Sequence, residues 1–544
     1  MGLAPANSRA EHADASGAAG DALLQCARRS DFRFLLPDPH PREVAILGEP
    51  APDLVASLRA LGARVRLLDA RDATRARDAD PPELVLARGG SRELVERAHA
   101  LLRPGGHLYV EARRASAAGL AAAARRAGLR DVATHWHWPD FARALEIAPL
   151  DDPGALRHAL SRRRSRPSSR AKAWLAGGLA RVGALPRLAP CVSVLARKEG
   201  PGEGAPGAGA IRFLETNRER LGLSRRGIRG PLSYLLVTPR FRASRHVIFL
   251  ALEPGRPEPV LVAKLPRLAD ATALAREAAN LRAVEPRGAP LASVPQVVAF
   301  EACGDRAILV ETALAGSALD AATVRRDFAP WGNAVADWLA GLGRSALEPG
   351  WFERLVEAPL DALARLASLS AEEARAIEQT RALAARLRGG PPPAVFEHGD
   401  LSPPNVLRLR DGGIGVLDWE LADPHGLPAG DLFFFLTWAA WARERAESRE
   451  ARVAAFGRAF FGRDAWARPF VLAYARQLGL PLASLTPLFA LTWARTLARF
   501  VDRLDGSAGP FARGSSEWLR QNRYYHAWRQ SLACADELRW SESR

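Results

Sequence analysis

The first part of the chain alternates short apolar runs with stretches that carry apolar residues at helical spacing. Strands are expected at 43–48, 64–70, 83–89 and 107–113, and helices at 52–62, 92–102 and 115–128. Such alternation is typical of a parallel sheet with helices on both faces. We therefore expect a Rossmann-like α/β domain over residues 29–199, ending in the strand CVSVLARK at 191–198, with residues 1–28 as a disordered lead-in.

The pattern changes after a Gly- and Pro-rich stretch, GPGEGAPGAGA at 200–210, which has no apolar periodicity and is typical of a linker. Strands are expected beyond it at 233–239, 246–252, 259–266, 297–302 and 307–314, with a helix at 271–284. The rest is predicted to be mostly helical, apart from a short island at 394–418. A small sheet with one helix, followed by a helical lobe, predicts a bilobal kinase-like domain over 211–538.

The segment VFEHGDLSPPNVLRLRDGGIGVLDWE at 395–420 holds the clearest candidate chemistry. His398, Asp400 and Asn405 stand in an H-x-D-x-x-x-x-N arrangement, and Asp418 ends the apolar strand that follows. Phosphoryl transfer needs a carboxylate near the attacking hydroxyl, which suits Asp400, and oxygen ligands for magnesium, which suit Asn405 and Asp418. Asp, Asn and Gly are also common in ordinary turns, but the complete string favours a phosphotransfer site.

This segment resembles the signature of the aminoglycoside phosphotransferase and choline kinase group, HGDLxxxN followed by an IDWE-like strand. The resemblance covers roughly residues 210–535 and implies a protein-kinase-like fold, ATP, magnesium and transfer to a hydroxyl of a small molecule. It implies that Asp400 is the catalytic base and that Asn405 and Asp418 bind magnesium. His398 is expected to hold the loop in shape, and Asp431 either to hydrogen-bond near the loop or to cap a helix.

The ATP-binding residues are expected in the strand-rich part. Lys264 is one of three lysines among 76 basic residues, at the end of the third strand, where kinase-like folds place a phosphate-binding lysine. Because Lys and Arg are not interchangeable at a phosphate site, this lysine favours that role over a simple edge charge. Glu277 is a candidate partner for Lys264, and residues from Val310 to Ala313 would form the hinge against the adenine ring.

The loop TPRFRASRH at 238–246, between the first two of these strands, departs from protein kinases because it has no glycine. Backbone amides, or the side chains of Arg240, Arg242 and Arg245, could cover the phosphates there instead.

The N-terminal domain has a resemblance of its own. LLRPGGHLYVEA at 101–112 resembles the turn and strand of S-adenosylmethionine-dependent methyltransferases, and Asp69 could match their ribose-binding acid. The first loop, ILGEPAPDL at 46–54, keeps only Gly48 where a working site usually has GxGxG. We therefore expect a methyltransferase-like fold that does not bind S-adenosylmethionine. A bifunctional methyltransferase-kinase and a non-catalytic scaffold are the alternatives.

The net charge of +16 comes from arginines that are spread along the chain and mixed with acids, which favours a solvated surface over nucleic acid or membrane binding. The basic segment 161–172 is predicted to be a solvated loop or helix edge, with membrane or nucleic-acid contact as the lesser alternative. Residues 421–544 contain 17 arginines and 12 acidic residues. The acceptor is expected to be a sugar, an amino alcohol or a glycan precursor. The charge balance disfavours polycationic aminoglycosides and suits a neutral or anionic hydroxyl compound, such as a sugar or a glycan precursor, better.

The remaining features indicate a cytoplasmic protein. The four cysteines form no CxxC pair, so neither a disulfide framework nor a zinc site is expected. The N-terminus lacks the apolar region of a signal peptide. The most apolar run, LFFFLTWAAWA at 432–442, is about half the length that spans a bilayer and is predicted to be a buried helix. Neither the acceptor nor the oligomeric state follows from the sequence.

Overall fold

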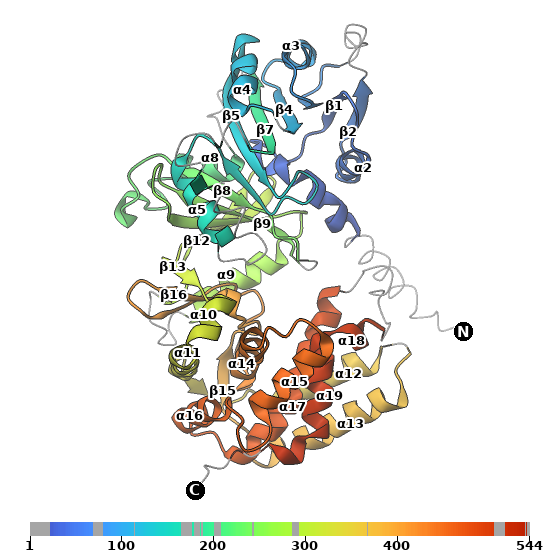
Figure 1. The fold of residues 1–544 in the computed structure, drawn as a ribbon, viewed down its shortest axis with the longest axis vertical. Coiled ribbons are helices and arrows are strands. Elements are labelled where there is room, and N and C mark those ends of the chain that lie inside the picture. Colours follow the sequence, from blue (N-terminus) through green and yellow to red (C-terminus); the bar gives the residue numbers. More distant parts are fainter. Residues whose placement is uncertain are drawn as a thin grey trace, which may run out of the picture. The chain divides into compact units, whose positions relative to one another are not determined.

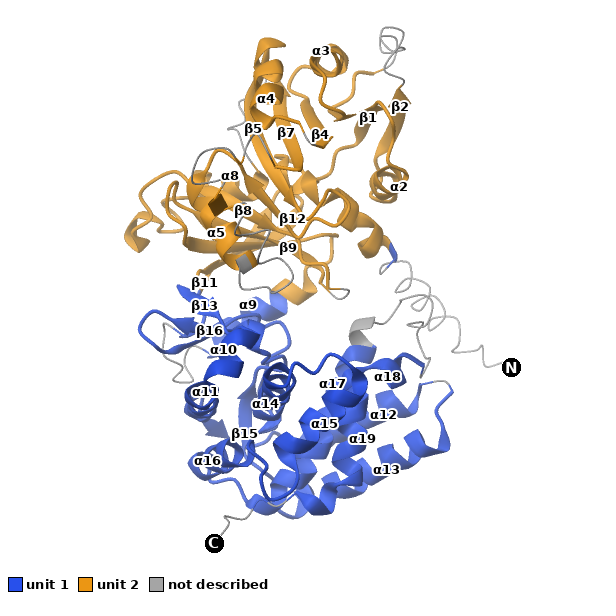
Figure 2. Ribbon diagram, viewed as in Figure 1, with its two compact units in different colours: residues 1–22, 275–296, 314–544 blue, residues 23–274, 297–313 orange. Residues whose placement is uncertain are grey.

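The computed structural model describes residues 22–68, 80–113, 115–164, 177–178, 185, 189–200, 208–241, 244–284, 293–366, 368–504, 517–538 and 540. The chain divides into two compact units (Figure 2). Residues 23–274 and 297–313 make up the first, here called the sheet unit. Residues 1–22, 275–296 and 314–544 make up the second, the helical unit.

A twelve-stranded sheet organises the sheet unit (Figure 1). Its strands follow the order β11-β12-β10-β9-β8-β6-β5-β7-β4-β3-β1-β2. In chain order they are β1 (Glu43–Leu47), β2 (Arg64–Leu68), β3 (Leu84–Arg88), β4 (His107–Arg113), β5 (Leu129–Trp138), β6 (Glu146–Pro149), β7 (Cys191–Lys198), β8 (Ser233–Val237), β9 (His246–Leu252), β10 (Pro259–Pro266), β11 (Val297–Cys303) and β12 (Arg306–Thr312). The strands expected at 191–198 and 259–266 are confirmed with those bounds.

The parallel strands expected near the N-terminus are present. β2, β1, β3 and β4 pair in parallel. The near-continuous apolar sequences of β1 and β3 fit strands that are buried on both faces, whereas β2, at the edge of the sheet, is partly exposed. The remaining pairs of the sheet are antiparallel. Residues 29–199 therefore contribute a mixed sheet rather than a purely parallel one.

One sheet joins the two parts of the chain that the sequence assigns to separate domains. β6 pairs with β8: Glu146 lies opposite Val237, and Ile147 lies opposite Leu236. In the sequence, β6 precedes the Gly/Pro stretch and β8 follows it. Sequence reasoning missed β6, which has only four residues, and β5, whose histidines interrupt the apolar pattern. Residues before and after 200–210 thus share one compact unit, and the domain boundary at 200–210 stays a prediction.

Helices cover both faces of this sheet. The helices are η1 (Arg28–Leu35), α2 (Pro52–Ala60), α3 (Arg92–Leu101), α4 (Ala117–Arg126), α5 (Pro153–Arg164), α8 (Gly209–Thr216) and η4 (Ser224–Arg226). η1, α2 and α8 share one apolar core with one face of the strands, and α3, α4 and α5 share another with the opposite face. Both cores continue onto β8 and β9, so the apolar packing, like the sheet, runs through both parts.

Residues 22–35 differ from the disordered lead-in expected up to residue 28. The chain is helical from residue 22, and Phe32 and Phe34 are buried in the core. Residues 1–21 lie outside the described part. Arg163, in the basic segment expected to be solvated, is also buried, because it pairs with Glu146 at 2.8 Å and lies over the rings of Trp136 and Trp138. Residues 165–172 of that segment are not described.

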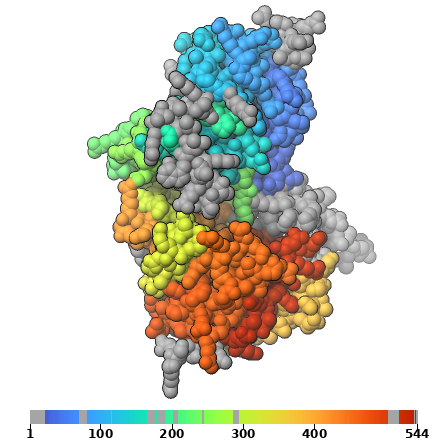
Figure 3. All heavy atoms as spheres, in the orientation of Figure 1, coloured from blue at the N-terminus to red at the C-terminus, as the bar shows by residue number. Residues whose placement is uncertain are grey.

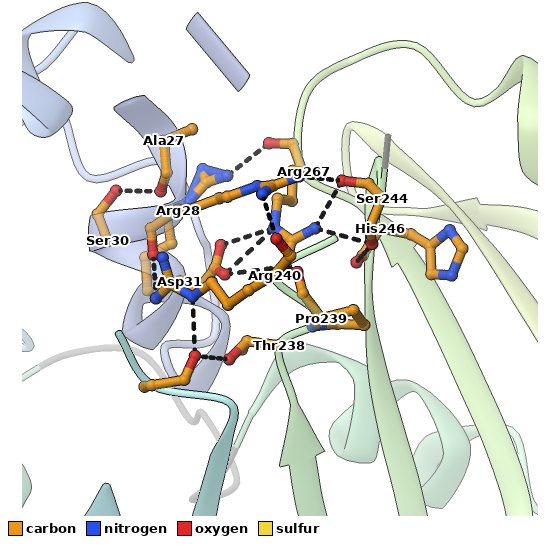
Figure 4. A network of polar contacts seen from close by, with 12 residues as sticks. Ala27, Arg28, Ser30, Asp31, Thr238, Pro239, Arg240, Ser244, His246 and Arg267 are labelled. Carbon is orange, nitrogen blue, oxygen red and sulfur yellow. Dashed lines mark hydrogen bonds and ion pairs between the residues drawn. The ribbon is translucent and has the colours of Figure 1, made fainter. Parts of the chain in front are cut away.

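A buried polar network ties η1 to the loop between β8 and β9 (Figure 4). Arg267 forms an ion pair with Asp31 at 3.1 Å, and both side chains are almost completely buried. Arg267 also donates to the carbonyls of Pro239 and Ser244, each at 2.9 Å. Arg28 donates to the carbonyls of Arg240 at 3.0 Å and Ser244 at 3.2 Å. The backbone of this loop is therefore fixed by arginines rather than by a glycine-rich turn.

The helical unit contains most of α9 (Thr272–Val284) and two three-stranded sheets, β13-β16-β17 and β14-β15-β18. Its strands are β13 (Gly316–Ala318), β14 (Arg344–Ser345), β15 (Ala394–Glu397), β16 (Val406–Leu409), β17 (Ile414–Val416) and β18 (Asp423–Gly426). Its longer helices are α10 (Ala321–Arg326), α11 (Ala329–Gly341), α12 (Ala358–Ala364), α13 (Ala371–Ala385), α14 (Gly430–Arg443), α15 (Arg449–Phe460), α16 (Arg468–Leu478), α17 (Leu485–Leu504), α18 (Glu517–Gln521) and α19 (Arg523–Ala533). The apolar run at 432–442 lies in α14 and is buried, as predicted. Among the described residues, no helix has both the length and the apolar character needed to cross a bilayer.

Candidate functional site

The loop that follows β15 carries His398, Asp400 and Asn405, and its shape is set by Asp431. The Asp431 carboxylate accepts hydrogen bonds from the backbone N–H groups of His398 at 2.6 Å and Gly399 at 2.8 Å. Gly399 has φ of +81°, and a Cβ there would lie 2.5 Å from the carbonyl of Leu421, so this position requires glycine. Of the two roles expected for Asp431, the geometry matches hydrogen bonding to the loop.

His398 connects the loop to the strand that precedes Asp418. Its Nδ1 accepts from the backbone N–H of Asp400 at 3.3 Å, and its Nε2 lies 2.9 Å from the carbonyl of Leu417. Burial lowers the pKa of His398 to about 4, so the ring is neutral at pH 7. A neutral ring with the proton on Nε2 satisfies both contacts, and the side chain acts as a rigid bridge.

Asn405 closes the loop from the other end. Its side-chain Nδ2 donates to the carbonyl of Asp400 at 2.9 Å, and its own carbonyl accepts from the N–H of Leu417 at 2.9 Å. These bonds bring the Asp400, Asn405 and Asp418 segments together. Because Nδ2 is used by the loop, the amide oxygen of Asn405 is the atom that could bind a cation.

Asp418 has the features of a cation ligand. Its backbone is left-handed, with φ of +68°, and its Oδ1 is buried without a hydrogen-bond partner in the described part of the chain. A buried carboxylate oxygen without a donor is costly unless a cation compensates it. No group of three or more His, Cys, Asp or Glu side chains among the described residues could hold a metal ion. A magnesium ion bound by Asn405 and Asp418 would therefore need further oxygen ligands, such as phosphates.

A buried ion-pair cluster lies beside the loop. Glu397 contacts Arg495 at 2.9 Å and Arg499 at 2.6 Å, and Arg499 also donates to the carbonyl of Gly399 at 3.2 Å. Burial opposes ionisation of Glu397, but the two arginines hold its pKa down at about 2. Burial and the charge of Glu397 raise the pKa of Asp431 to about 7. No local pattern in the sequence indicates this cluster, because the arginines lie about a hundred residues away on α17.

α9 binds the segment that follows Asp418. Glu277, fully buried, accepts from the N–H of Trp419 at 3.2 Å. Asn280, one turn later, donates to the carbonyls of Trp419 at 2.8 Å and Ala422 at 3.1 Å. Asn280 was not foreseen from the sequence, where it is one polar residue on an apolar helix. The expected pairing of Glu277 with Lys264 involves residues of both units and stays a prediction.

The predicted nucleotide residues of the sheet unit lie on β10 and β12. Lys264 is buried and contacts Glu311 at 3.0 Å. Val310 is fully buried next to Glu311, and the N–H of Ala313 donates to the carbonyl of Val260 at 3.4 Å. Glu311 lies inside the expected hinge range, but the sequence did not identify it as a partner for Lys264.

The loop arginines differ from one of the expectations above. The guanidinium of Arg240 donates to the carbonyls of Ala144 at 2.9 Å and Arg28 at 3.0 Å, so it anchors the loop instead of being available to phosphates. Arg245 is described, and its carbonyl accepts from the N–H of Arg267 at 2.8 Å. Arg242 and Asp69 lie outside the described residues.

Comparison with known proteins agrees with the C-terminal assignment. Residues 242–470 match the model of a family described as the phosphotransferase enzyme family. No curated protein matches the chain in sequence.

Several solved structures are similar to part of the chain. An ethanolamine kinase of Plasmodium vivax is 11% identical over 62% of this chain and 91% of its own, with a TM-score of 0.35. A choline kinase of Streptococcus pneumoniae is 14% identical over 58% and 99%, with a TM-score of 0.37. An aminoglycoside phosphotransferase of Streptomyces rimosus, solved with ADP and streptomycin, is 16% identical over 52% and 98%, with a TM-score of 0.32. Because these TM-scores and identities are low, the assignment depends on the family match. In the C-terminal part of this chain, residues 242–470 thus resemble the phosphotransferase enzyme family.

Proposed function

We propose that this protein is an ATP- and magnesium-dependent kinase that phosphorylates a hydroxyl of a small molecule. In this reaction the hydroxyl oxygen attacks the γ-phosphorus, the bond to the β-phosphate oxygen breaks, and ADP leaves. Asp400 accepts the proton of the attacking hydroxyl. The family match over 242–470 and the hydrogen bonds that link the Asp400, Asn405 and Asp418 segments support this proposal.

The observation that carries the proposal is the buried, unpartnered Oδ1 of Asp418. Asp418 and the amide oxygen of Asn405 would hold magnesium, and the ion, when bound, neutralises charge on the triphosphate. The protein holds the two ligand segments by fixed bonds: His398 joins Asp400 to Leu417, and α9 binds the backbone on the other side of Asp418. This arrangement needs little reorganisation when a nucleotide arrives.

For the nucleotide, we assign Lys264 to the α- and β-phosphates and Val310–Ala313 to the adenine. Lys264 is held on β10 by its ion pair with Glu311, and Glu277 is held on α9 by its bond to Trp419. Either glutamate could receive the Lys264 ammonium. Glu311→Gln and Glu277→Gln, compared for their ADP affinity, would identify the one that positions Lys264 for phosphate.

The N-terminal part, in our proposal, is a methyltransferase-like fold that does not bind S-adenosylmethionine. In a parallel sheet of this kind, ligands bind beyond the carboxyl ends of the strands. There, Arg29 of η1 binds Glu111 of β4 through two hydrogen bonds of 2.9 and 3.0 Å and contacts Asp53 of α2 at 3.1 Å. Phe32 of the same helix stacks on Tyr109 at 4.1 Å. η1 therefore fills space that a cofactor would need.

Calorimetric titration of the full chain with S-adenosylmethionine tests this part of the proposal. We expect no binding at micromolar concentrations. Micromolar affinity would instead favour the bifunctional methyltransferase-kinase.

The non-catalytic scaffold is the other alternative, and ATP turnover separates it from the kinase. The experiment is an ADP-release screen of the full chain with ATP and magnesium against sugars, amino alcohols, nucleosides and aminoglycosides. A kinase gives acceptor-dependent ADP together with a phosphorylated product. ADP binding without turnover on any acceptor class would support the scaffold.

A further inference from the structure

A cavity of ≈ 320 Å³ lies in the helical unit between α14, α15 and the last two helices, and it is lined mainly by cationic and aromatic side chains. The residues that matter here are Trp441, Arg449, Arg452, Arg520, Arg523 and His526. α15 and α19 pack against each other, and the space-filling view shows the orange atoms of the α15 region next to the red atoms of the last helices (Figure 3). The volume is sufficient for a small metabolite.

Several of these arginines lack an acidic partner. Arg520 is paired with Glu373 at 2.9 Å. In contrast, no carboxylate of the described residues forms an ion pair with Arg449, Arg452 or Arg523. Arg452 donates only its Nε to a backbone carbonyl, that of Ala446 at 3.2 Å. Three guanidinium groups around one cavity repel each other, so an anion bound between them would be stabilised strongly.

The aromatic residues of this region do not provide a site for a cation. Trp438, Trp441 and Tyr524 resemble a cage for a quaternary ammonium, but the Arg523 guanidinium already lies 4.1 Å from the ring centre of Trp438, 5.3 Å from that of Trp441 and 5.0 Å from that of Tyr524. The protein's own cation therefore occupies the position that a ligand cation would need. His526 adds no positive charge to the cavity, because burial and the nearby Arg449 lower its pKa and favour the neutral ring.

The cavity is connected to the candidate site through α14 and Tyr524. α14 begins at Gly430, next to Asp431, which binds the catalytic loop, and reaches the cavity at Trp441. Trp438, on the same helix, donates to the hydroxyl of Tyr524 at 3.0 Å. Burial raises the pKa of Tyr524 to about 12, and the charges of Arg523 and Asp400 act on the same hydroxyl in opposite directions, Arg523 lowering the pKa and Asp400 raising it.

We infer that the acceptor is anionic: it carries a phosphate or carboxylate group that binds Arg449, Arg452 and Arg523 in this cavity while its hydroxyl reaches Asp400. This inference rests on the proposed kinase function and names the class of its substrate, a hydroxyl compound such as a sugar phosphate or a sugar acid. It also gives a structural basis for the excess of arginine over acidic residues in 421–544.

Calorimetric titration of the full chain, saturated with ADP and magnesium so that the nucleotide site is filled, tests this inference without turnover. The probes are matched sets with one carbon skeleton: glucose, glucosamine, glucose 6-phosphate and glucuronate, and glycerol with glycerol 3-phosphate and glycerate. We expect an anionic member to bind at least about 10-fold more tightly than its neutral and amino counterparts, since charge-assisted hydrogen bonds are the strong ones. The phosphate and carboxylate members show which group the cavity prefers.

The variants Arg523→Gln and Arg452→Gln should weaken that binding by about 10- to 100-fold. Arg523→Lys, which keeps the positive charge, should retain part of the affinity for the anionic probe. Arg529→Gln is the matched control, because Arg529 is on the same helix but binds Glu372 outside the cavity. Circular dichroism of each variant separates lost binding from lost folding.

Three results would each overturn the inference. The first is that neutral or amino members bind as tightly as the anionic ones, and the second is that no anionic member binds. The third is unchanged binding in correctly folded Arg523→Gln and Arg452→Gln. Failure of the proposed kinase function gives a different result from failure of the anion site. Anion binding that depends on Arg523 but never leads to phosphate transfer would leave the anion site intact and contradict the kinase. Transfer of phosphate to an uncharged acceptor, at a rate that Arg523→Gln leaves unchanged, would support the kinase and contradict the anion site.

Discussion

The side chains at the candidate site have different partners, and this determines which of them are free for chemistry. His398, Asn405 and Asp431 use their polar atoms on the backbone of the loop and the strand after it. Asp418 keeps a buried oxygen without a donor. The paired atoms contribute shape, whereas the unpaired oxygen of Asp418 and the amide oxygen of Asn405 are the atoms that we assign to a ligand.

Replacing Asp418 by Asn should remove the response of the protein to magnesium. Asn tolerates the left-handed backbone at this position, so the change is mainly one of charge. We expect magnesium and ADP to raise the thermal midpoint of the wild type but to have little effect on Asp418→Asn. Without ligands, the variant should unfold at the same or a higher temperature, because a buried uncompensated charge is lost. A variant that is stabilised by magnesium and ADP as strongly as the wild type would contradict the metal assignment.

His398 predicts an acid-sensitive loop. Its pKa in the folded state is about 4, below the ordinary histidine value of 6.5, so the unfolded chain binds the proton more readily between these values. The contribution to stability is complete above about pH 6.5 and falls by up to about 3 kcal/mol as the pH drops towards 4.

Urea unfolding at pH 7 and at pH 5 would measure this effect. His398→Gln should be less stable than the wild type at pH 7 and should lose less stability on acidification. Other buried histidines also titrate, so the informative quantity is the difference between wild type and variant. Equal losses in both proteins would rule out His398 as the source.

Residue types and spacing were sufficient to predict the polar residues of the loop, because Asp400, Asn405 and Asp418 lie within one short segment. The same reasoning could not find Asn280, Glu311, Arg495 or Arg499. Each acts on a partner far away in sequence or on a neighbouring strand, and arginines four apart on a helix look like ordinary surface charges until the helix is packed. Lys264 was noticeable only because the chain so rarely uses lysine.

At the scale of elements, η1 joins the N-terminal part to the loop between β8 and β9. The fully buried pair of Arg267 with Asp31 is the centre of this connection. The sequence predicts a disordered lead-in at the start of this region, because its apolar residues are interrupted by three arginines and an aspartate. The charges are neutralised by partners distant in sequence: Arg29 pairs with Asp53 and Glu111, and Asp31 pairs with Arg267, more than two hundred residues away.

Arg267→Met should therefore destabilise the sheet unit strongly. It leaves Asp31 buried and uncompensated, which typically costs about 3–5 kcal/mol. The double variant Arg267→Met with Asp31→Leu should recover much of the loss, because no charge remains buried. Arg97→Met, which breaks an exposed ion pair with Glu93, is the control and should change little. Denaturant unfolding gives all four values, and a mild effect of Arg267→Met would show that η1 is not held by this pair.

At the scale of the whole molecule, the sheet extends through the region that the sequence divides. The pattern of apolar positions correctly predicted the parallel strands, the strands beyond residue 232 and the mostly helical remainder. It could not show that a four-residue strand, β6, joins the two sets, since pairing between distant strands is not encoded in local periodicity.

A chain that begins at residue 208 should consequently fail to fold as a stable monomer. It would expose the edge of β8 and half of two apolar cores. We expect insolubility or a broad, early thermal transition, measured beside the full chain by size-exclusion chromatography and calorimetry. A soluble monomer with an unchanged midpoint would instead support two independent domains joined at 200–210.

The central claim is that the 398–418 segment transfers phosphate to a hydroxyl, and Asp400 is its most direct test. The measurement is ADP and phosphorylated product formed by the full chain with ATP, magnesium and an acceptor found in the screen, for wild type and Asp400→Asn. We predict acceptor-dependent turnover that falls by about 100-fold or more in the variant, with ADP affinity nearly unchanged, because the base is lost and the nucleotide site is not. A variant that keeps more than about a tenth of the wild-type rate would contradict the account, because loss of a general base is expected to cost more than that.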